Sequence, residues 1–147
     1  VRSYQVVPLA RSLDYDVTVV DPRTAFANPG RFPDVPLIAE WPDFALPPLN
    51  IDRYTAFVAL THDPKIDDPA LMHAFQRDCF YIGALGSRKT HAKRAERLKA
   101  EGAGDSDIAR IHAPIGLPIG AVSPSEIAVA IMAEITAQLR LPKEEMA

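Results

Sequence analysis

The sequence predicts an α/β protein in which a parallel sheet carries helices on both faces. Short uncharged runs rich in β-branched and aromatic residues alternate with segments that carry helix-capping signals, the pattern expected of strands joined by crossover helices. Gly, Pro, Asn and Asp residues mark the turns between them. The 147 residues are 48% hydrophobic and 24% charged, as in globular domains, and can bury one core. We therefore expect a single domain over residues 1–147.

The expected strands are identified by composition. The run 55–61 has no charged residue, and 79–83 has only apolar or uncharged residues, which favours strands buried on both faces. A β-branched run that ends in an acid, Asp21, indicates another buried strand. The predicted extended segments are residues 16–21, 37–41, 55–61, 79–83 and 111–113.

The expected helices are identified by their ends. Ser123 and Glu126 form a capping box around a proline at the first helical position, and Ser87 is a suitable N-cap. Pro8 fits the first helix only if it lies in the first turn. Asp67 begins an acidic first turn of a third helix. The predicted helices are residues 1–13, 67–77, 87–101, 106–110 and 123–139, and 41–48 is irregular or one helical turn.

One strand of the expected sheet is missing from these residues. A helix followed by a strand that ends in Asp21 is the second half of a dinucleotide-binding unit, yet no GxGxxG occurs. The neighbours of the missing strand would otherwise expose unpaired edges. We expect a Rossmann-like, doubly wound parallel sheet whose first strand and Gly-rich turn precede Val1, in the C-terminal part of a longer protein. A preceding segment or another chain, as in a homo-oligomer, would fill the slot.

Charge and cysteine content exclude several classes of protein. A net charge of −3 argues against a nucleic-acid-binding surface. The single Cys79 excludes a disulfide framework, an iron–sulfur pattern or a Cys-rich metal site, and no HExxH motif suggests zinc. No apolar run approaches the roughly 20 residues of a membrane span, and the first apolar stretch is too interrupted for a signal peptide. We expect a soluble, cytoplasmic protein with no bound metal.

Polar residues gather where the expected strands end. In open parallel sheets, ligands bind at the carboxyl ends of the strands, near the switch in strand order. The candidate binding residues at these ends are Asp21, Arg23, Thr61, His62, Asp63, Gly83, Gly86, Ser87, Arg88, Lys89, His112 and Gly116. By contrast, His91 lies on a helix with several basic residues and is expected to be solvated, and Cys79 is expected to be a buried, inert thiol.

The turn at residues 83–89 is the sharpest signal among them. Its glycines allow close backbone approach, Ser87 begins a helix whose N–H groups attract an anion, and Arg88 can grip a phosphate. The spacing is not that of a Walker A loop, and an ordinary tight turn with solvated basic residues is the alternative.

The remaining candidates allow two interpretations each. Asp21 suits the ribose of NAD and Arg23 a 2′-phosphate, or Asp21 caps the following turn. His62 and Asp63 suit an acid/base pair or metal ligands, or belong to an Asp–Pro turn. Spacing alone therefore predicts a nucleotide-like or phosphate-bearing ligand at the rim of the sheet.

Several motifs are similar to those of one family. They are FYIGALGSRKTH (80–91), RIHAPIGLPIGA (110–121) and SEIAVAIMAEI (125–135), together with VTVVDPR (17–23) and LTHDP (60–64). These segments resemble the C-terminal, Rossmann-like domain of the xanthine dehydrogenase accessory (XdhC/CoxI) family. The resemblance covers nearly the whole chain.

The resemblance implies a chaperone rather than a catalyst. Such proteins bind molybdenum cofactor (molybdopterin), protect it during sulfuration and deliver it to a molybdenum hydroxylase such as xanthine dehydrogenase. The implied partners are that apoenzyme and a cysteine desulfurase. In this interpretation Gly86, Ser87 and Arg88 hold the terminal phosphate of the cofactor, and residues 61–63 contact the pterin edge. An NAD(P)-dependent oxidoreductase, motivated by Asp21, and a non-catalytic interaction domain remain alternatives.

Overall fold

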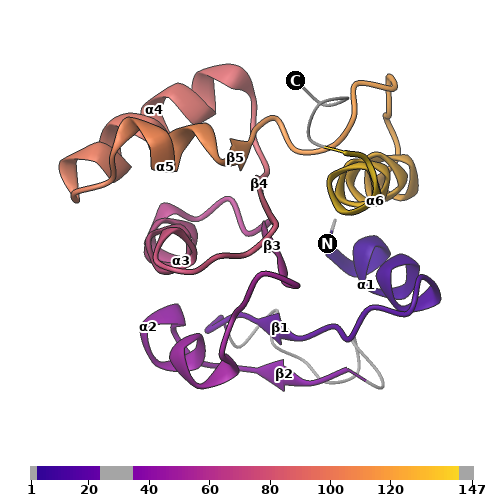
Figure 1. The fold of residues 1–147 in the computed structure, drawn as a ribbon, viewed down its shortest axis with the longest axis horizontal. Helices are drawn as coiled ribbons and strands as arrows, with labels where there is room; N and C mark the ends of the chain where they lie inside the picture. Colours follow the sequence, from indigo (N-terminus) through magenta and orange to yellow (C-terminus); the bar gives the residue numbers. More distant parts are fainter. Residues whose placement is uncertain (1–2, 24–34, 143–147) are drawn as a thin grey trace.

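The computed structural model describes residues 3–23 and 35–142 (Figure 1). Helices and short parallel strands alternate along these residues. The elements are α1 (Ser3–Ser12), β1 (Val19–Val20), β2 (Leu37–Ile38), α2 (Pro42–Ala45), the 3-10 helix η2 (Pro47–Leu49), β3 (Ala56–Ala59), α3 (Pro64–Phe75), β4 (Tyr81–Ala84), α4 (Arg88–Ala100), α5 (Asp105–Ala109), β5 (Ile111–His112) and α6 (Pro124–Arg140). None of the helices in the described ranges combines the length and the apolar character of a membrane-spanning segment.

The strands are parallel, as predicted, and form two separate sheets. β1 pairs with β2, and a second sheet has the order β3-β4-β5. In Figure 1, β1 lies between β2 and β3, but no ladder joins β1 to β3 within the described residues. The break falls where the sequence predicts an absent strand, and it leaves one edge of β1 and one edge of β3 without a partner strand in the described ranges.

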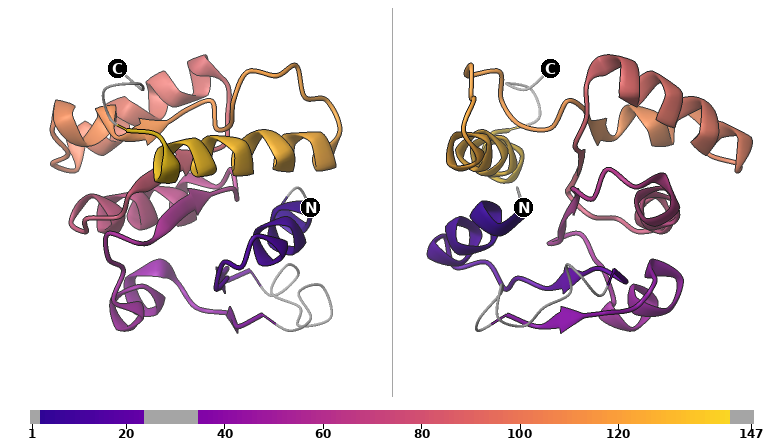
Figure 2. Two further views of the ribbon diagram at one scale, coloured as in Figure 1. Left: turned by 45° about the vertical axis from the view of Figure 1, so that its right-hand side comes forward. Right: turned by 180° about the vertical axis from the view of Figure 1, so that it is seen from behind.

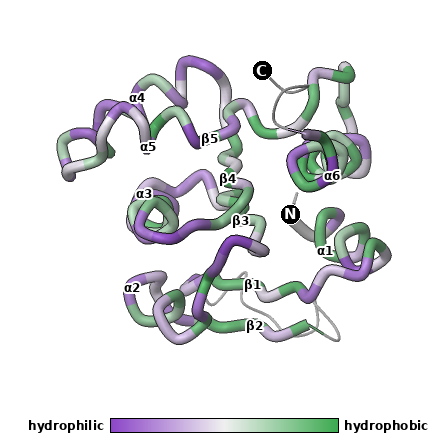
Figure 3. Tube along the Cα trace, viewed as in Figure 1, coloured by the Kyte–Doolittle hydropathy of each residue, from purple (hydrophilic) through white to green (hydrophobic). Residues whose placement is uncertain are grey.

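Helices cover both faces of the three-stranded sheet. α3, α4 and α5 lie on one side, and α1 and α6 lie together on the other, which both views of Figure 2 show. β4 divides the core between these layers, because Ile82 packs toward α3 and α4 whereas Tyr81 packs toward α6. All four residues of β4 are buried, as its uncharged sequence predicts, and Figure 3 shows this hydrophobic strand beside a largely hydrophilic α4.

β3 departs from the same prediction. Only Ala59 of its four residues is fully buried. Its edge toward β1 has no partner strand in the described part of the chain, so β3 is less enclosed than β4. β1 is likewise limited to Val19–Val20 rather than residues 16–21.

Two proline positions differ from the sequence prediction. Pro8 lies inside α1 rather than in its first turn, and the helix is held by packing of its apolar face, including the buried Ala10, against α6. α3 begins at Pro64, one turn before Asp67, because Asp63 is its N-cap and accepts a hydrogen bond from the Lys65 N–H at 3.0 Å. Asp67 is therefore a buried residue inside the helix.

Candidate functional site

A small cavity lies at the carboxyl edge of the three-stranded sheet. Since β3 and β4 are parallel, the turns that follow them reach this edge together. The cavity has a volume of about 110 Å³ and lies between the N-terminal parts of α3 and α4. Its lining residues are His62, Pro64, Asp67, Asp68, Thr90, Lys93, Arg94 and Arg97. We call it the α3–α4 cleft.

The turn after β3 is organised by the carboxylate of Asp67. The Thr61 hydroxyl donates to Asp67 Oδ1 at 2.6 Å, and the His62 N–H donates to Oδ2 at 3.1 Å. These bonds hold His62 at a φ of 67°, in the left-handed region, with an exposed side chain. Burial raises the pKa of Asp67, although the bonds from Thr61 and His62 and the charge of Arg94 oppose this. Asp63 caps α3 directly before Pro64, which matches the Asp–Pro turn, one of the two interpretations that the sequence allows for this residue.

The turn after β4 has the cap that the sequence predicts. Ser87 Oγ accepts a hydrogen bond from the Thr90 N–H at 3.1 Å. Gly86 has a φ of 134°, and a Cβ there would lie 3.0 Å from Thr90 Cγ2, so both conformation and space favour glycine. Arg88 and Lys89 are exposed and do not line the α3–α4 cleft. The cleft instead meets α4 from Thr90 onward.

Arg94 is a buried cation that the sequence patterns do not single out. It is only 3% exposed, and its Nη2 donates to the Leu85 carbonyl at 2.8 Å. Its Nε and Nη1 are buried and have no hydrogen-bond partner in the described part of the chain. Burial lowers the pKa of Arg94, against the charges of Asp67 and Asp68. The sequence does contain one indication of this burial. Leu98, which is also buried, lies four residues after Arg94, and this spacing puts both residues on the inner face of α4.

The other cations of the cleft differ from Arg94. Arg97 of α4 donates two hydrogen bonds to Asp68 of α3, at 2.7 and 3.3 Å. Lys93 is exposed and forms no ion pair with any described residue. The charges of Arg97 and Asp68 cancel. The positive charges of Lys93 and Arg94 then exceed the single negative charge of Asp67. The cleft therefore has an excess of positive charge.

Asp21 and Arg23 bind each other at the end of β1. The Arg23 Nη2 and Nε atoms lie 2.8 and 3.0 Å from the two Asp21 carboxylate oxygens, and the Arg23 N–H donates to Oδ1 at 2.9 Å. This is the turn-capping role left open by the sequence. The bond to Asp21 raises the pKa of Arg23 against the effect of burial, and the charges of Asp63 and Asp67 add to the increase.

His112 and Gly116 lie apart from the cleft, against α6. The Tyr81 hydroxyl donates to Glu134 Oε1 at 2.6 Å, the Gly116 N–H donates to it at 3.1 Å, and His112 Nδ1 lies 3.6 Å away. The Tyr81 and His112 rings stack with centroids 4.7 Å apart. We call these four residues the Glu134 cluster. Tyr81 and Glu134 are not predicted site residues, because local sequence patterns do not reveal contacts between residues so distant in the chain.

In the Glu134 cluster, burial and the cluster's own hydrogen bonds shift the pKa values of Tyr81 and Glu134. Burial and the bond to Glu134 both raise the pKa of Tyr81 well above its ordinary value. Burial opposes ionisation of Glu134, but its bonds from His112, Tyr81 and Gly116 outweigh burial and lower its pKa. Gly83 is required by packing here, since a Cβ would lie 2.6 Å from Ile115 Cδ1. The predicted candidates therefore fall into a cleft group, the Asp21–Arg23 pair and a group against α6.

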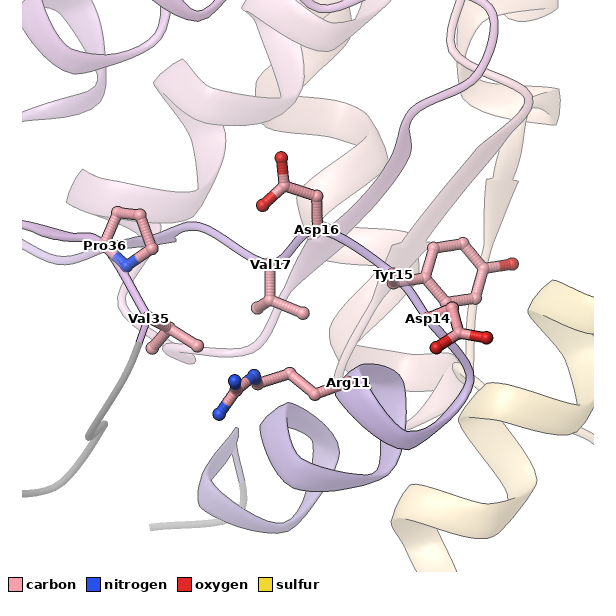
Figure 4. Close-up of a pocket in the computed structure, with 7 residues that line it drawn as sticks. All are labelled: Arg11, Asp14, Tyr15, Asp16, Val17, Val35 and Pro36. Carbon is pink, nitrogen blue, oxygen red and sulfur yellow. The ribbon is translucent and has the colours of Figure 1, made fainter.

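A larger cavity, of about 380 Å³, lies elsewhere (Figure 4). Its lining residues are Arg11, Asp14, Tyr15, Asp16, Val17, Val35 and Pro36, which surround the end of α1 and precede β1 and β2. It is thus at the amino ends of these strands and includes no predicted site residue. Because ligands of open parallel sheets bind at the carboxyl ends, we take the smaller α3–α4 cleft as the candidate site. Across residues 3–23 and 35–142, no group of three or more His, Cys, Asp or Glu side chains is placed to hold a metal ion.

Comparisons with known proteins agree with one another. The family model of the XdhC Rossmann domain matches residues 2–135. The chain is 34% identical over 128 residues to a protein of Bacillus subtilis (strain 168) that is named a probable xanthine dehydrogenase subunit, covering 86% of this chain and 37% of that protein. It is 37% identical over 96 residues to the molybdenum cofactor insertion chaperone PaoD of Escherichia coli (strain K12), covering 65% of this chain and 30% of that protein.

A solved structure extends the likeness to the fold. A crystal structure described as a xanthine dehydrogenase from Bacillus halodurans superimposes with a TM-score of 0.79 at 26% identity, covering 95% of this chain and 40% of that chain. The predicted Rossmann-like fold is confirmed. The chain spans 37% and 30% of the lengths of the two curated relatives.

Proposed function

The chain belongs to the XdhC family, and from this premise we propose that it binds molybdenum cofactor and takes part in its delivery to a molybdenum hydroxylase. The cofactor is cargo in this role, so the chain needs a site that grips and releases it rather than a catalytic centre. The likeness to an insertion chaperone, at 37% identity over 96 residues, supports the proposal.

The observation that carries the proposal is the convergence of polar turns at one edge of the sheet. His62, from the turn after β3, and Thr90, in the first turn of α4, line one positively charged cleft at the carboxyl edge of the sheet. A planar pterin with a terminal phosphate presents polar edges and negative charge, which such an edge can hold. The proposed contact residues are Arg23, Thr61, His62, Asp63, Gly86, Ser87, Arg88 and Lys89.

The NAD(P)-dependent alternative has weaker support. Both carboxylate oxygens of Asp21 already accept hydrogen bonds from Arg23, so this pair would have to separate before Asp21 could bind a ribose. Asp21 is also only 8% exposed. We therefore rank cofactor delivery above hydride transfer.

We also propose the partners and setting that go with this role. The recipient is an apoenzyme of the xanthine dehydrogenase type, a cysteine desulfurase supplies sulfur, and the setting is the cytoplasm. The edges of β1 and β3 that lack a partner strand in the described residues support pairing with a strand from another segment of a longer protein or from a second copy. In that arrangement residues 1–147 are one Rossmann-like domain.

The experiment is a binding and transfer assay on the full chain. We expect pterin fluorescence to co-purify with the protein after incubation with molybdenum cofactor released from a donor enzyme, and the loaded protein to restore activity to a molybdenum hydroxylase apoenzyme. Arg88→Ala should reduce the bound pterin, with Lys99→Ala, on the same helix but paired with Asp105, as the matched control. Tight NADH binding without bound pterin would contradict the proposal and favour the oxidoreductase.

A further inference from the structure

We propose that the α3–α4 cleft is an oxyanion site that holds a phosphate group of the ligand, with Arg94 as its buried cation. The inference rests on the proposed function for the ligand that carries the phosphate, and on the cleft itself for the chemistry. It moves the phosphate from the Gly86–Arg88 turn, where the sequence predicts it, to the next turn of α4.

Arg94 supplies the first argument. A guanidinium that is 3% exposed loses most of its hydration, so its donors need acceptors. Only Nη2 has one, the Leu85 carbonyl, whereas Nε and Nη1 have none in the described part of the chain. One edge of the planar guanidinium carries Nη1 and the second hydrogen of Nη2, and two oxygens of a phosphate could accept from that edge.

The balance of charge supplies the second argument. Asp67 does not form an ion pair with Arg94 within the described residues, since both of its oxygens accept hydrogen bonds from the turn that contains Thr61 and His62. Asp68 is occupied by Arg97. The exposed Lys93 and the buried Arg94, which both line the cleft, therefore give it a net positive charge. An anion is the ligand that such a cleft favours.

The position and size of the cleft supply the third argument. Pro64 and Thr90 belong to the first turns of α3 and α4, so the positive ends of two helices border the cleft. Its 110 Å³ is well below the roughly 300–1,000 Å³ of pockets that enclose drug-sized ligands. The cleft thus suits one tetrahedral group, and the rest of the ligand would extend over the exposed His62.

The experiment uses inorganic phosphate as the probe on the full chain. We expect calorimetry to detect saturable binding, and phosphate to shift the amide NMR signals of Thr90 and Lys93. Lys93→Ala should weaken binding by about tenfold, because one charge-assisted contact is lost. Arg94→Lys, which keeps the charge but not the fork, should also weaken it, with circular dichroism verifying the fold. Lys99→Ala, on the same helix with its ammonium 2.8 Å from Asp105, should bind like the original protein.

Several outcomes separate this inference from the proposed function. Equal phosphate affinity in Lys93→Ala and Lys99→Ala, or no saturable binding, would overturn the oxyanion site. If molybdenum cofactor and its dephosphorylated form bound equally well, the oxyanion site would fall while the proposed function stood. If phosphate bound as described but the cofactor did not, the oxyanion site would stand and the proposed function would fall.

Discussion

Asp67 and Glu134 lie in different helix layers and accept nearly the same hydrogen bonds. Each receives a hydroxyl at 2.6 Å, from Thr61 or Tyr81, and a backbone N–H at 3.1 Å. Their pKa values nevertheless shift in opposite directions, upward for Asp67 and downward for Glu134.

Burial and the nearest basic group account for this difference. Asp67 is 3% exposed, and burial outweighs its bonds. The side chain of Glu134 is 14% exposed and has His112 at 3.6 Å, so its bonds outweigh burial. The Glu134 cluster therefore satisfies itself, whereas the α3–α4 cleft retains donors on Arg94 that have no acceptor among the described residues. Buried donors without acceptors require an explanation, and the oxyanion proposed for the cleft provides one.

The largest expected effect comes from crowding the Glu134 cluster. In Gly83→Ala the new Cβ would lie 2.7 Å from the Tyr81 hydroxyl and 2.6 Å from Ile115. We expect the free energy of unfolding to fall by about 3 kcal/mol, since Ile115 and the Tyr81 hydroxyl, which is bonded to Glu134, would both have to shift. Urea denaturation measures this. A loss below about 0.5 kcal/mol would mean that the cluster is loosely packed.

Removing the carboxylate of the cluster should cost somewhat less. Glu134→Leu leaves the buried Tyr81 hydroxyl and the Gly116 N–H without their acceptor. We expect a loss of about 2 kcal/mol in unfolding free energy. Tyr81→Phe, which removes one donor and leaves the other, is the matched variant and should lose about half as much. Equal losses in both variants would contradict a shared role for the carboxylate.

The two carboxylates should impose opposite pH dependence on stability. The pKa of Asp67 is raised in the folded state. Asp67 therefore contributes fully to the free energy of unfolding below pH 3.8, its ordinary pKa, and this contribution is lost as the pH rises through the folded pKa. The pKa of Glu134 is lowered, so its contribution is present above 4.5 and is lost as the pH falls through the folded pKa.

Urea denaturation at several acidic pH values tests this contrast. Asp67→Asn should remove a decline in stability toward neutral pH, and Glu134→Gln should remove a decline toward acid. Parallel pH profiles for the two variants would mean that the difference between the carboxylates does not exist in solution.

The smallest expected effect comes from the exposed ion pair of the cleft. Arg97→Ala removes two bonds to Asp68, yet the Arg97 side chain is 41% exposed. We expect a change of about 0.5 kcal/mol in unfolding free energy. Phosphate affinity should also fall in this variant, because Asp68 would then oppose Lys93 and Arg94. Unchanged affinity would show that Asp68 does not influence the cleft.

Local features of the fold could be predicted from the sequence. Ser87 and the Ser123–Glu126 capping box were identified correctly, because a cap depends on residues within one turn of itself. The start of α3 was misplaced at Asp67 because the sequence offers two acidic starts, and only the structure shows that Asp63 accepts the capping bond.

The chemistry of the candidate site was less accessible. The burial of Arg94 depends on how α4 packs against α3 and β4, so its place among the basic residues of this helix does not reveal it. The Glu134 cluster joins residues 81, 112, 116 and 134, a combination that local patterns do not reveal. The edge of the sheet was predictable from strand order, but the deepest cation at that edge was not.

Mapping where molybdopterin binds tests the central claim most directly. We predict that adding it to the full chain shifts the amide NMR signals of His62, Thr90 and Lys93, at the carboxyl edge, and leaves those of Arg11 and Tyr15 unchanged. Shifts confined to Arg11, Tyr15 and Val17, around the larger cavity at the amino ends of β1 and β2, would contradict the account.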